Sequence, residues 1–142
     1  MRLIDMGVDG YLVASSVRAV VAQRLVRRIC DVCQTEHQPT DQENAILQQW
    51  LVGTEIPSQF YAGRGCSRCN MTGYRGRIGV FEFLELDEAM RNALRNSDAA
   101  AFARAAQQSA NYVPLNRAAL AYAGEGVTTL DEVMRVSETE TI

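Results

Sequence analysis

The sequence of 142 residues contains no lysine, and all fourteen of its basic residues are arginine. A Walker A phosphate-binding loop needs a lysine that reaches the β and γ phosphates of ATP. The chain therefore cannot contain such a loop, and any machinery that hydrolyses ATP must come from elsewhere. The sequence also offers no nucleophile–base pair and no paired-carboxylate signature, so a stand-alone enzyme has little support.

Long apolar runs are missing as well. Arg18 and Arg24 interrupt the most hydrophobic segment, so no run approaches membrane-spanning length. With 47% hydrophobic and 22% charged residues, the composition is that of ordinary soluble globular material, enough for one domain or a small domain with an insertion. The formal net charge of −3 gives no general sign of nucleic-acid binding.

The four cysteines form two Cys-x-x-Cys pairs, which thirty-two residues separate. Each pair folds the chain back so that two thiolates point at one centre, and two such turns supply the four sulfurs that structural zinc prefers. A closed set of four leaves no open coordination position, so this zinc would be structural and not catalytic. Two other interpretations stay open: a redox dithiol, which leaves one pair unexplained, and two disulfides, against which the lack of a signal peptide argues. The candidate ligands are Cys30, Cys33, Cys66 and Cys69.

The single histidine, His37, follows the first cysteine pair by four residues and is a candidate fifth ligand. Because four cysteines already fill the coordination sphere of zinc, we expect His37 to be an exposed bystander.

Hydrophobic spacing and capping residues predict helices along much of the chain. One helix is expected to begin at Ser15 or Ser16 and to run to about Ala22, while residues 23–29 fit either a helix or a strand. Thr129 and Glu132 have the spacing of a capping box for a short final helix. Further helices are expected at 41–51, 88–95, 99–108 and 115–123.

Gly73, Gly76 and Gly79 place three glycines in seven positions, which predicts a tight turn. Residues 78–86 are expected to form a strand. The arginines of this turn and its backbone N–H groups are suited to binding phosphate. Composition alone favours a simpler interpretation, a turn that leads into a buried strand.

Several stretches occur together in one order along nearly the whole chain, and their combination is far more specific than a four-cysteine pattern. They are residues 2–8, 14–16 and 22–30, the two cysteine pairs, the segment Thr72-Gly-Tyr-Arg-Gly-Arg-Ile-Gly79 with Glu82, and residues 126–136. In this combination the chain resembles the C-terminal part of the assembly ATPases of type II secretion and type IV pili, the GspE/PilB family. The sequence of these stretches is especially similar to the MSHA-pilus branch of that family.

The resemblance implies an α/β fold: the C-terminal part of a RecA-like ATPase domain, with an inserted tetracysteine zinc subdomain and a helical C-terminal portion. Residues 1–29 would end the RecA-like core with a helix and then a strand, 30–71 would be the zinc-binding insertion, 72–86 a late strand of the core, and 87–142 the helical portion. The resemblance also implies that residues 23–29 and 77–86 are strands of the RecA-like sheet. Arg77 and Gly79 would lie in the strand region nearest the nucleotide.

The family's Walker A, aspartate box, Walker B and histidine box do not occur in these 142 residues. The resemblance therefore implies a parent that uses ATP and Mg²⁺, and a fragment that is inactive alone, with Met1 an artificial start or an internal methionine. It implies a cytoplasmic homohexamer, peripheral to the bacterial inner membrane, whose partners are neighbouring subunits and the inner-membrane platform protein. No nucleic-acid partner is expected.

The alternative function is a nucleic-acid-binding zinc ribbon. Basic residues cluster near the second cysteine pair while the rest of the chain is acidic, and Tyr61 and Tyr74 are placed where they could stack bases. Phosphate contacts of this kind weaken steeply with salt. The residues that would make them are Arg64, Arg68, Arg75 and Arg77.

Overall fold

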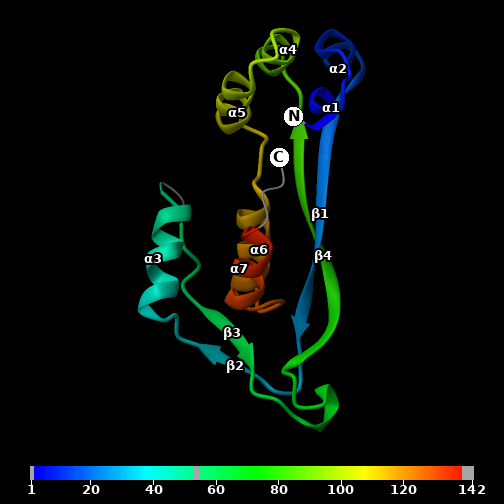
Figure 1. Cartoon of the computed structure of the whole chain (residues 1–142). Helices are drawn as coiled ribbons and strands as arrows, with labels where there is room; N and C mark the ends of the chain where they lie inside the picture. Colours follow the sequence, from blue (N-terminus) through cyan, green and yellow to red (C-terminus); the bar gives the residue numbers. More distant parts are fainter. Residues whose placement is uncertain (1, 53–54, 139–142) are drawn as a thin grey trace. The chain divides into compact units, whose positions relative to one another are not determined.

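The computed structural model describes residues 2–52 and 55–138, which form two compact units of mixed helix and strand (Figure 1). The first unit comprises residues 2–22 and 82–114, and the second comprises 23–52, 55–81 and 115–138. Two long strands, β1 (Ala19–Ile29) and β4 (Tyr74–Glu85), are hydrogen-bonded neighbours, and each contributes residues to both units. None of the described helices is long and apolar enough to cross a membrane.

The first unit contains the helices α1 (Arg2–Asp5), α2 (Gly10–Ser16), α4 (Glu88–Arg95) and α5 (Ala99–Gln108). Aspartates cap three of them, because the side chains of Asp9, Asp87 and Asp98 each accept a hydrogen bond from a backbone N–H in the first turn. Helix α4 packs against both α2 and α5. The buried residues of its core cluster are Val13, Ala14, Leu84, Leu86, Met90, Leu94 and Ala106.

Two polar side chains form hydrogen bonds that connect separate segments of the first unit. The Arg91 guanidinium donates to three backbone carbonyl oxygens, two of them at the C-terminal end of α2, where the helix leaves its acceptors unsatisfied. The Tyr112 hydroxyl donates to the carboxylate of Glu82, a residue that is 2% exposed. Burial and this contact with a carboxylate raise the pKa of Tyr112 well above its ordinary value.

The second unit contains β2 (Gln34–His37), α3 (Asp41–Trp50), β3 (Phe60–Gly63), a short 3₁₀ helix η1 (Ser67–Cys69), α6 (Leu115–Gly124) and α7 (Leu130–Ser137). Strands β2 and β3 pair antiparallel, with Gln34 opposite Gly63 and His37 opposite Phe60. Helix α6 packs against α7 and β3.

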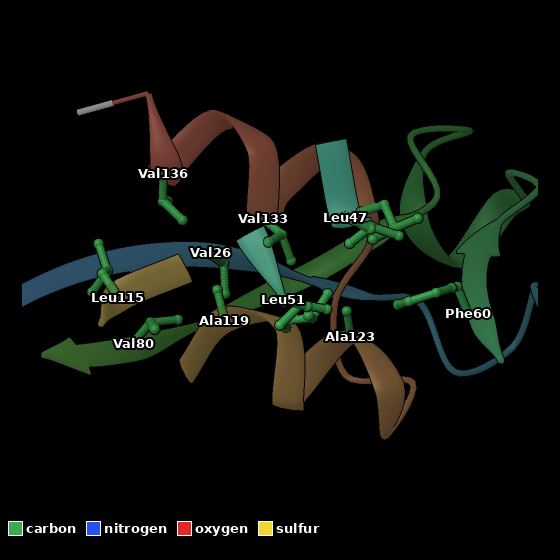
Figure 2. Packing of buried hydrophobic residues seen from close by; sticks show 12 residues of the cluster. Val26, Leu47, Leu51, Phe60, Val80, Leu115, Ala119, Ala123, Val133 and Val136 are labelled. Carbon is green, nitrogen blue, oxygen red and sulfur yellow. The ribbon is translucent and has the colours of Figure 1, made fainter. Parts of the chain in front are cut away.

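Apolar side chains from strands and helices form the core of the second unit (Figure 2). Val26 of β1, Val80 of β4 and Leu47 of α3 are all 0% exposed. Burial of a valine or leucine side chain contributes about 1.5–3 kcal/mol, so this cluster stabilises the unit more than any single polar contact. Its buried members are Val26, Leu47, Leu51, Phe60, Val80, Leu115, Ala119, Leu120, Ala123, Leu130, Val133 and Val136.

One buried carboxylate joins α7 to β1. Glu132 is 1% exposed, and its carboxylate accepts hydrogen bonds from the backbone N–H of Arg27 at 2.8 Å and from the Arg27 guanidinium at 3.0 and 3.1 Å. Arg135 donates to the same carboxylate at 2.8 and 3.2 Å, and to the Leu25 carbonyl at 2.9 Å. Burial alone would raise the pKa of Glu132, but these N–H donors outweigh it and lower the pKa to about 2.

The predicted helix from Ser15 or Ser16 to Ala22 is wrong. Helix α2 begins at Gly10 with Asp9 as its cap, it ends at Ser16, and strand β1 begins at Ala19. The reason is tertiary, because β1 pairs with β4 and its β-branched residues suit a strand. The strand that the resemblance implied for residues 23–29 is confirmed.

The other predicted elements are confirmed with small shifts at their ends. The helices expected at 41–51, 88–95, 99–108 and 115–123 correspond to α3, α4, α5 and α6, and the strand expected at 78–86 is the later part of β4. Only half of the predicted capping box forms: the Thr129 hydroxyl accepts from the Glu132 N–H at 3.2 Å, while the Glu132 carboxylate binds Arg27 and Arg135.

We expect Glu132→Gln to lower the free energy of unfolding by about 2 kcal/mol at pH 7, because Gln cannot form the ion pairs and both arginine partners are half exposed to screening water. The folded-state pKa of Glu132 is depressed, so its stabilisation is complete above the ordinary value of 4.5 and is lost as the pH falls toward 2. Urea unfolding at pH 7 and at pH 4 measures the difference between wild type and variant, which should shrink at the lower pH.

The matched control is Asp131→Asn, which removes an exposed carboxylate from the same turn and should change stability by less than about 0.5 kcal/mol. Any acid sensitivity elsewhere in the chain is common to wild type and variant, so it cancels in the difference. An equal loss at both pH values would show that ionisation of Glu132 is not what holds α7 against β1.

Candidate metal centre

Four cysteine sulfurs converge in the second unit. The Sγ atoms of the four cysteines lie within 4.8 Å of one another. The Sγ–Sγ distance is 3.8 Å from Cys30 to Cys66, 3.9 Å from Cys33 to Cys69, and 3.7 Å from Cys66 to Cys69. Four sulfurs arranged as a tetrahedron around one zinc, each about 2.3 Å from it, stand about 3.8 Å apart. The cluster therefore has the size that one tetrahedral metal ion requires.

Two short turns present these sulfurs. The first, residues 30–33, connects β1 to β2, and the second, residues 66–69, is η1 with Cys66 at its N-terminal cap. Asn70 and Met71 follow with φ of 53° and 63°, left-handed conformations that are uncommon outside glycine. The Met71 N–H donates to the Cys66 carbonyl at 2.8 Å, so the chain reverses tightly around the second pair.

The two ends of the segment that carries the second cysteine turn make a close backbone approach that only glycine permits. A Cβ added to Gly63 would lie 2.1 Å from the Gly73 carbonyl oxygen, and one added to Gly73 would lie 2.5 Å from the Gly63 carbonyl oxygen. The Gly73 carbonyl also accepts from the Cys30 N–H at 2.9 Å, and the Arg64 N–H donates to the Cys33 carbonyl at 3.1 Å. The residues on either side of the second turn are thus hydrogen-bonded to the first turn.

Backbone N–H groups point at two of the sulfurs. Gly65 donates to Cys33 Sγ at 3.3 Å, while Cys66 and Gly73 donate to Cys69 Sγ at 3.3 and 3.2 Å. Burial raises the pKa of the Cys33 thiol to about 11, against the single N–H donor. Burial also acts on Cys69, but its two donors outweigh it and lower the pKa to about 6. Such donors favour the thiolate, the form that binds metal.

His37 lies outside the cluster. The described His, Cys, Asp and Glu side chains form one group that could hold a metal, and His37 is not in it. Its Nε2 is 3.0 Å from Oε2 of Glu43, and the same carboxylate accepts from the Thr40 N–H at 2.8 Å in the capping box of α3. His37 is half-buried and not exposed as expected, because it packs at this helix cap.

Arg77 lies beside an open cavity of about 260 Å³ near the second cysteine turn. The Arg27 guanidinium, 4.0 Å from the centre of the Tyr74 ring, borders the same cavity, and the Tyr74 hydroxyl is 2.7 Å from the Thr129 hydroxyl. The lining residues are Arg27, Thr72, Tyr74, Gly76 and Arg77.

Gly79, the other residue expected near nucleotide, is not among those lining residues. It lies against Gln23 and Phe81, and an added Cβ would be 3.0 Å from the Gln23 amide nitrogen. The structure therefore places Arg77 at the same cavity as Arg27, whereas Gly79 does not line that cavity. Contact of either residue with nucleotide stays a prediction.

Comparison with known proteins bears on this site. The family "Type II/IV secretion system protein" matches residues 1–135 of the chain. The chain belongs to this family. The resemblance to the GspE/PilB group is thereby confirmed, while the nearer likeness to the MSHA-pilus branch stays a prediction.

Curated relatives match along almost the whole chain. "Type II secretion system protein E" of Pseudomonas aeruginosa is 36% identical over 144 residues, covering 98% of the chain and 27% of the relative. "Type II secretion system ATPase E" of Vibrio cholerae is 34% identical over 137 residues, covering 96% and 26%. "Type IV pilus assembly ATPase PilB" of Thermus thermophilus is 34% identical over 134 residues, covering 94% and 15%. The chain thus spans about a quarter or less of each relative.

Sequence reasoning found the four sulfurs but missed what holds the two cysteine turns together. Strands β2 and β3 were not expected, because each has four residues and β2 is polar. The contact of Gly63 with Gly73 was also missed, although each glycine stands three residues before or four after a cysteine of the second pair. Glycines so near the cysteine turns are the signal that could have found it.

We expect Gly73→Ala to weaken metal binding far more than Gly76→Ala. Both glycines have positive φ, 79° and 81°, so alanine strains both by about 1–2 kcal/mol. Only at Gly73 would the new Cβ collide with backbone, since the nearest atom at Gly76 is Arg28 Cδ at 3.8 Å. Competition with a chromophoric chelator should show a loss of affinity at least about tenfold larger for Gly73→Ala. Equal losses would mean that the approach to Gly63 does not hold the site together.

Proposed function

We propose that the chain is the zinc-binding, structural and interaction portion of a motor ATPase that powers type II secretion or type IV pilus assembly. The observation that carries the proposal is a four-sulfur cluster of tetrahedral size in a chain of the type II/IV secretion family. Four thiolates fill the coordination sphere of zinc, so the ion would supply rigidity and no catalysis. The ligands in this proposal are Cys30, Cys33, Cys66 and Cys69.

Zinc would act as a staple for the segment between β1 and β4. Strands β2 and β3 form a two-stranded sheet of four residues each, a size that is marginal without further support. Metal bound by two turns that are distant in sequence fixes both ends of this insertion at one point, and the free energy of metal binding then becomes free energy of folding. The proposed domain division keeps 30–71 as the zinc-binding insertion.

In the same proposal β1 and β4 are late strands of a RecA-like core, and residues 87–142 are the helical C-terminal portion. Hydrolysis of ATP with Mg²⁺ would reside in parts of the parent that this lysine-free sequence does not contain, so the chain alone is inactive. Arg77 and Gly79 would lie nearest the nucleotide. For Arg77 the support is the open cavity that it shares with Arg27, because paired guanidinium groups suit phosphate.

The relatives are named as proteins of type II secretion and as ATPases of type IV pilus assembly, which supports a motor that works with such a machine. We propose a cytoplasmic parent at the bacterial inner membrane, assembled as a homohexamer, which contacts its neighbouring subunits and the platform protein of the secretion or pilus machine. A rigid zinc-bound portion would move as one body while the ATPase core changes shape, and so would transmit force to those partners.

The first test combines metal content with the location of the stabilisation. Protein purified without chelator should contain one zinc per chain, and a strong chelator should lower its melting temperature. Hydrogen exchange should then speed up in β2 and β3 but not in α4 and α5, which belong to a separate unit with its own core. If the chelator changed neither the melting temperature nor the hydrogen exchange in β2 and β3, the proposed structural role of zinc would be contradicted.

Paired variants connect the staple to the motor. Cys69→Ser removes one ligand, and Ser67→Ala alters an exposed residue in the same 3₁₀ helix. Placed in the full-length parent, Cys69→Ser should abolish secretion or piliation while Ser67→Ala retains it. Retention of function by a Cys69→Ser parent that has lost its zinc would contradict the proposed role.

A nucleic-acid-binding ribbon is the competing function, and one observation favours it. The arginines at 64, 68, 75 and 77 are exposed, and none takes part in the ion pairs of the described residues. Against it, the Tyr74 ring is covered by Arg27 and its hydroxyl is bonded to Thr129. We expect no binding to a labelled oligonucleotide at 0.15 M salt, whereas binding that fell steeply with added salt would favour the ribbon.

A further inference from the structure

The four cysteines are not equally accessible. Cys30 is 0% exposed, and Cys33 and Cys69 are each 5% exposed. Cys66 is the one cysteine of the four that is not buried. Of the four cysteines, Cys66 is therefore the one that a reactant in solvent reaches most readily.

The four sulfurs also differ in their hydrogen bonds. Cys69 Sγ accepts from two backbone N–H groups, those of Cys66 and Gly73, whereas Cys66 Sγ accepts from the Cys69 N–H in the capping box of η1. An N–H donor withdraws electron density from a thiolate and lowers its nucleophilicity. When all four sulfurs are metal-bound thiolates, the greater exposure of Cys66 singles it out as the first to react, and the two donors at Cys69 make that sulfur the weaker nucleophile of the pair.

The Cys69 sulfur lies close enough to Cys66 to form a disulfide with it once Cys66 is oxidised. Cys69 Sγ is 3.7 Å from Cys66 Sγ, and both belong to one four-residue turn. Cys30 Sγ is almost as near, at 3.8 Å, but it belongs to the other turn and is fully buried. Joining Cys66 to Cys69 needs only a local change in η1, so this pair is the favoured one.

We infer that Cys66 is an oxidation site through which a hydroperoxide opens the metal centre by forming a Cys66–Cys69 disulfide. The inference rests on the zinc site of the proposed function. It goes beyond that function because it makes the rigidity of the insertion depend on the oxidant level around the protein.

The reaction balances in two steps. The Cys66 thiolate attacks one oxygen of hydrogen peroxide, the O–O bond breaks, and a sulfenic acid forms while hydroxide leaves. The Cys69 thiolate then attacks the Cys66 sulfur, an S–S bond forms, and a second hydroxide leaves. Two sulfurs lose two electrons in total, one peroxide gains them, and two protons from solvent convert the hydroxides to water. Only two thiolates then remain for the metal, so its affinity falls and it dissociates.

The test treats the zinc-loaded chain with less than one equivalent of hydrogen peroxide. Zinc release is followed with a chromophoric chelator, and the remaining thiols are alkylated before digestion with trypsin. Cleavage after Arg64, Arg68 and Arg75 places Cys66 on peptide 65–68 and Cys69 on peptide 69–75, while Cys30 and Cys33 share peptide 29–64. The expected product is peptide 65–68 disulfide-linked to peptide 69–75, formed in step with zinc release and reversed by a thiol reductant. Oxidation of the exposed Met71 adds one oxygen to peptide 69–75 and is separable by mass.

A ligand-preserving variant provides the control. Cys66→His keeps a nitrogen donor in a Cys₃His set that zinc accepts, and it should release zinc to peroxide at least about tenfold more slowly. If this variant does not bind zinc, the peptide map of the wild-type chain tests the inference by itself. The inference would be overturned if the first disulfide to form joined Cys30 to Cys66, or if zinc were released without any modification of Cys66. Either result would leave the proposal of a zinc site standing. Protein that carries no zinc before peroxide is added would instead overturn the proposed function, and this inference with it.

Discussion

The requirement that four cysteine sulfurs meet at one point is the constraint on which the second unit depends. Two turns that are thirty-two residues apart must arrive together, and the Sγ atoms of both pairs lie within 4.8 Å of one another. The approach of Gly63 to Gly73 closes the segment of the second turn, and the bonds from Cys30 to the Gly73 carbonyl and from Arg64 to the Cys33 carbonyl hold it beside the first turn. The segment between β1 and β4 is therefore organised from the end that carries the cysteines.

The same end of the unit also fixes the C-terminal helix. The backbone segment that leads into α7 is bonded to strands that carry the cysteine turns: the Ile29 N–H donates to the Val127 carbonyl, and the Gln34 amide donates to the Gly126 carbonyl. Further along, Glu132 accepts from Arg27 of β1 through both backbone and side chain. Loss of order at the cysteine turns would thus reach α7 through a contiguous path of hydrogen bonds within one unit.

Local features of the sequence predicted the parts of the fold that local physics decides. The stripe and caps of 88–95 and 99–108 place α4 and α5, because Asp87 and Asp98 satisfy N–H groups within their own first turns. The spacing of the cysteines likewise predicted the sulfur cluster, since each Cys-x-x-Cys turn is self-contained.

What failed depends on partners far away in the sequence. The helix expected up to Ala22 is a strand because β1 pairs with β4, some sixty residues further on. Glu132 has the spacing of a capping-box residue, yet its carboxylate is bound by Arg27, 105 residues away. The short strands β2 and β3 carry no strong pattern of their own and are recognisable only once the cysteine turns are brought together.

X-ray absorption at the zinc edge, on chain purified without chelator, tests the central claim most directly. The account predicts a first shell of four sulfur atoms at about 2.3 Å with no nitrogen or oxygen neighbour. A shell that contains nitrogen or oxygen, or protein that holds no zinc while its fold stays intact, would contradict it.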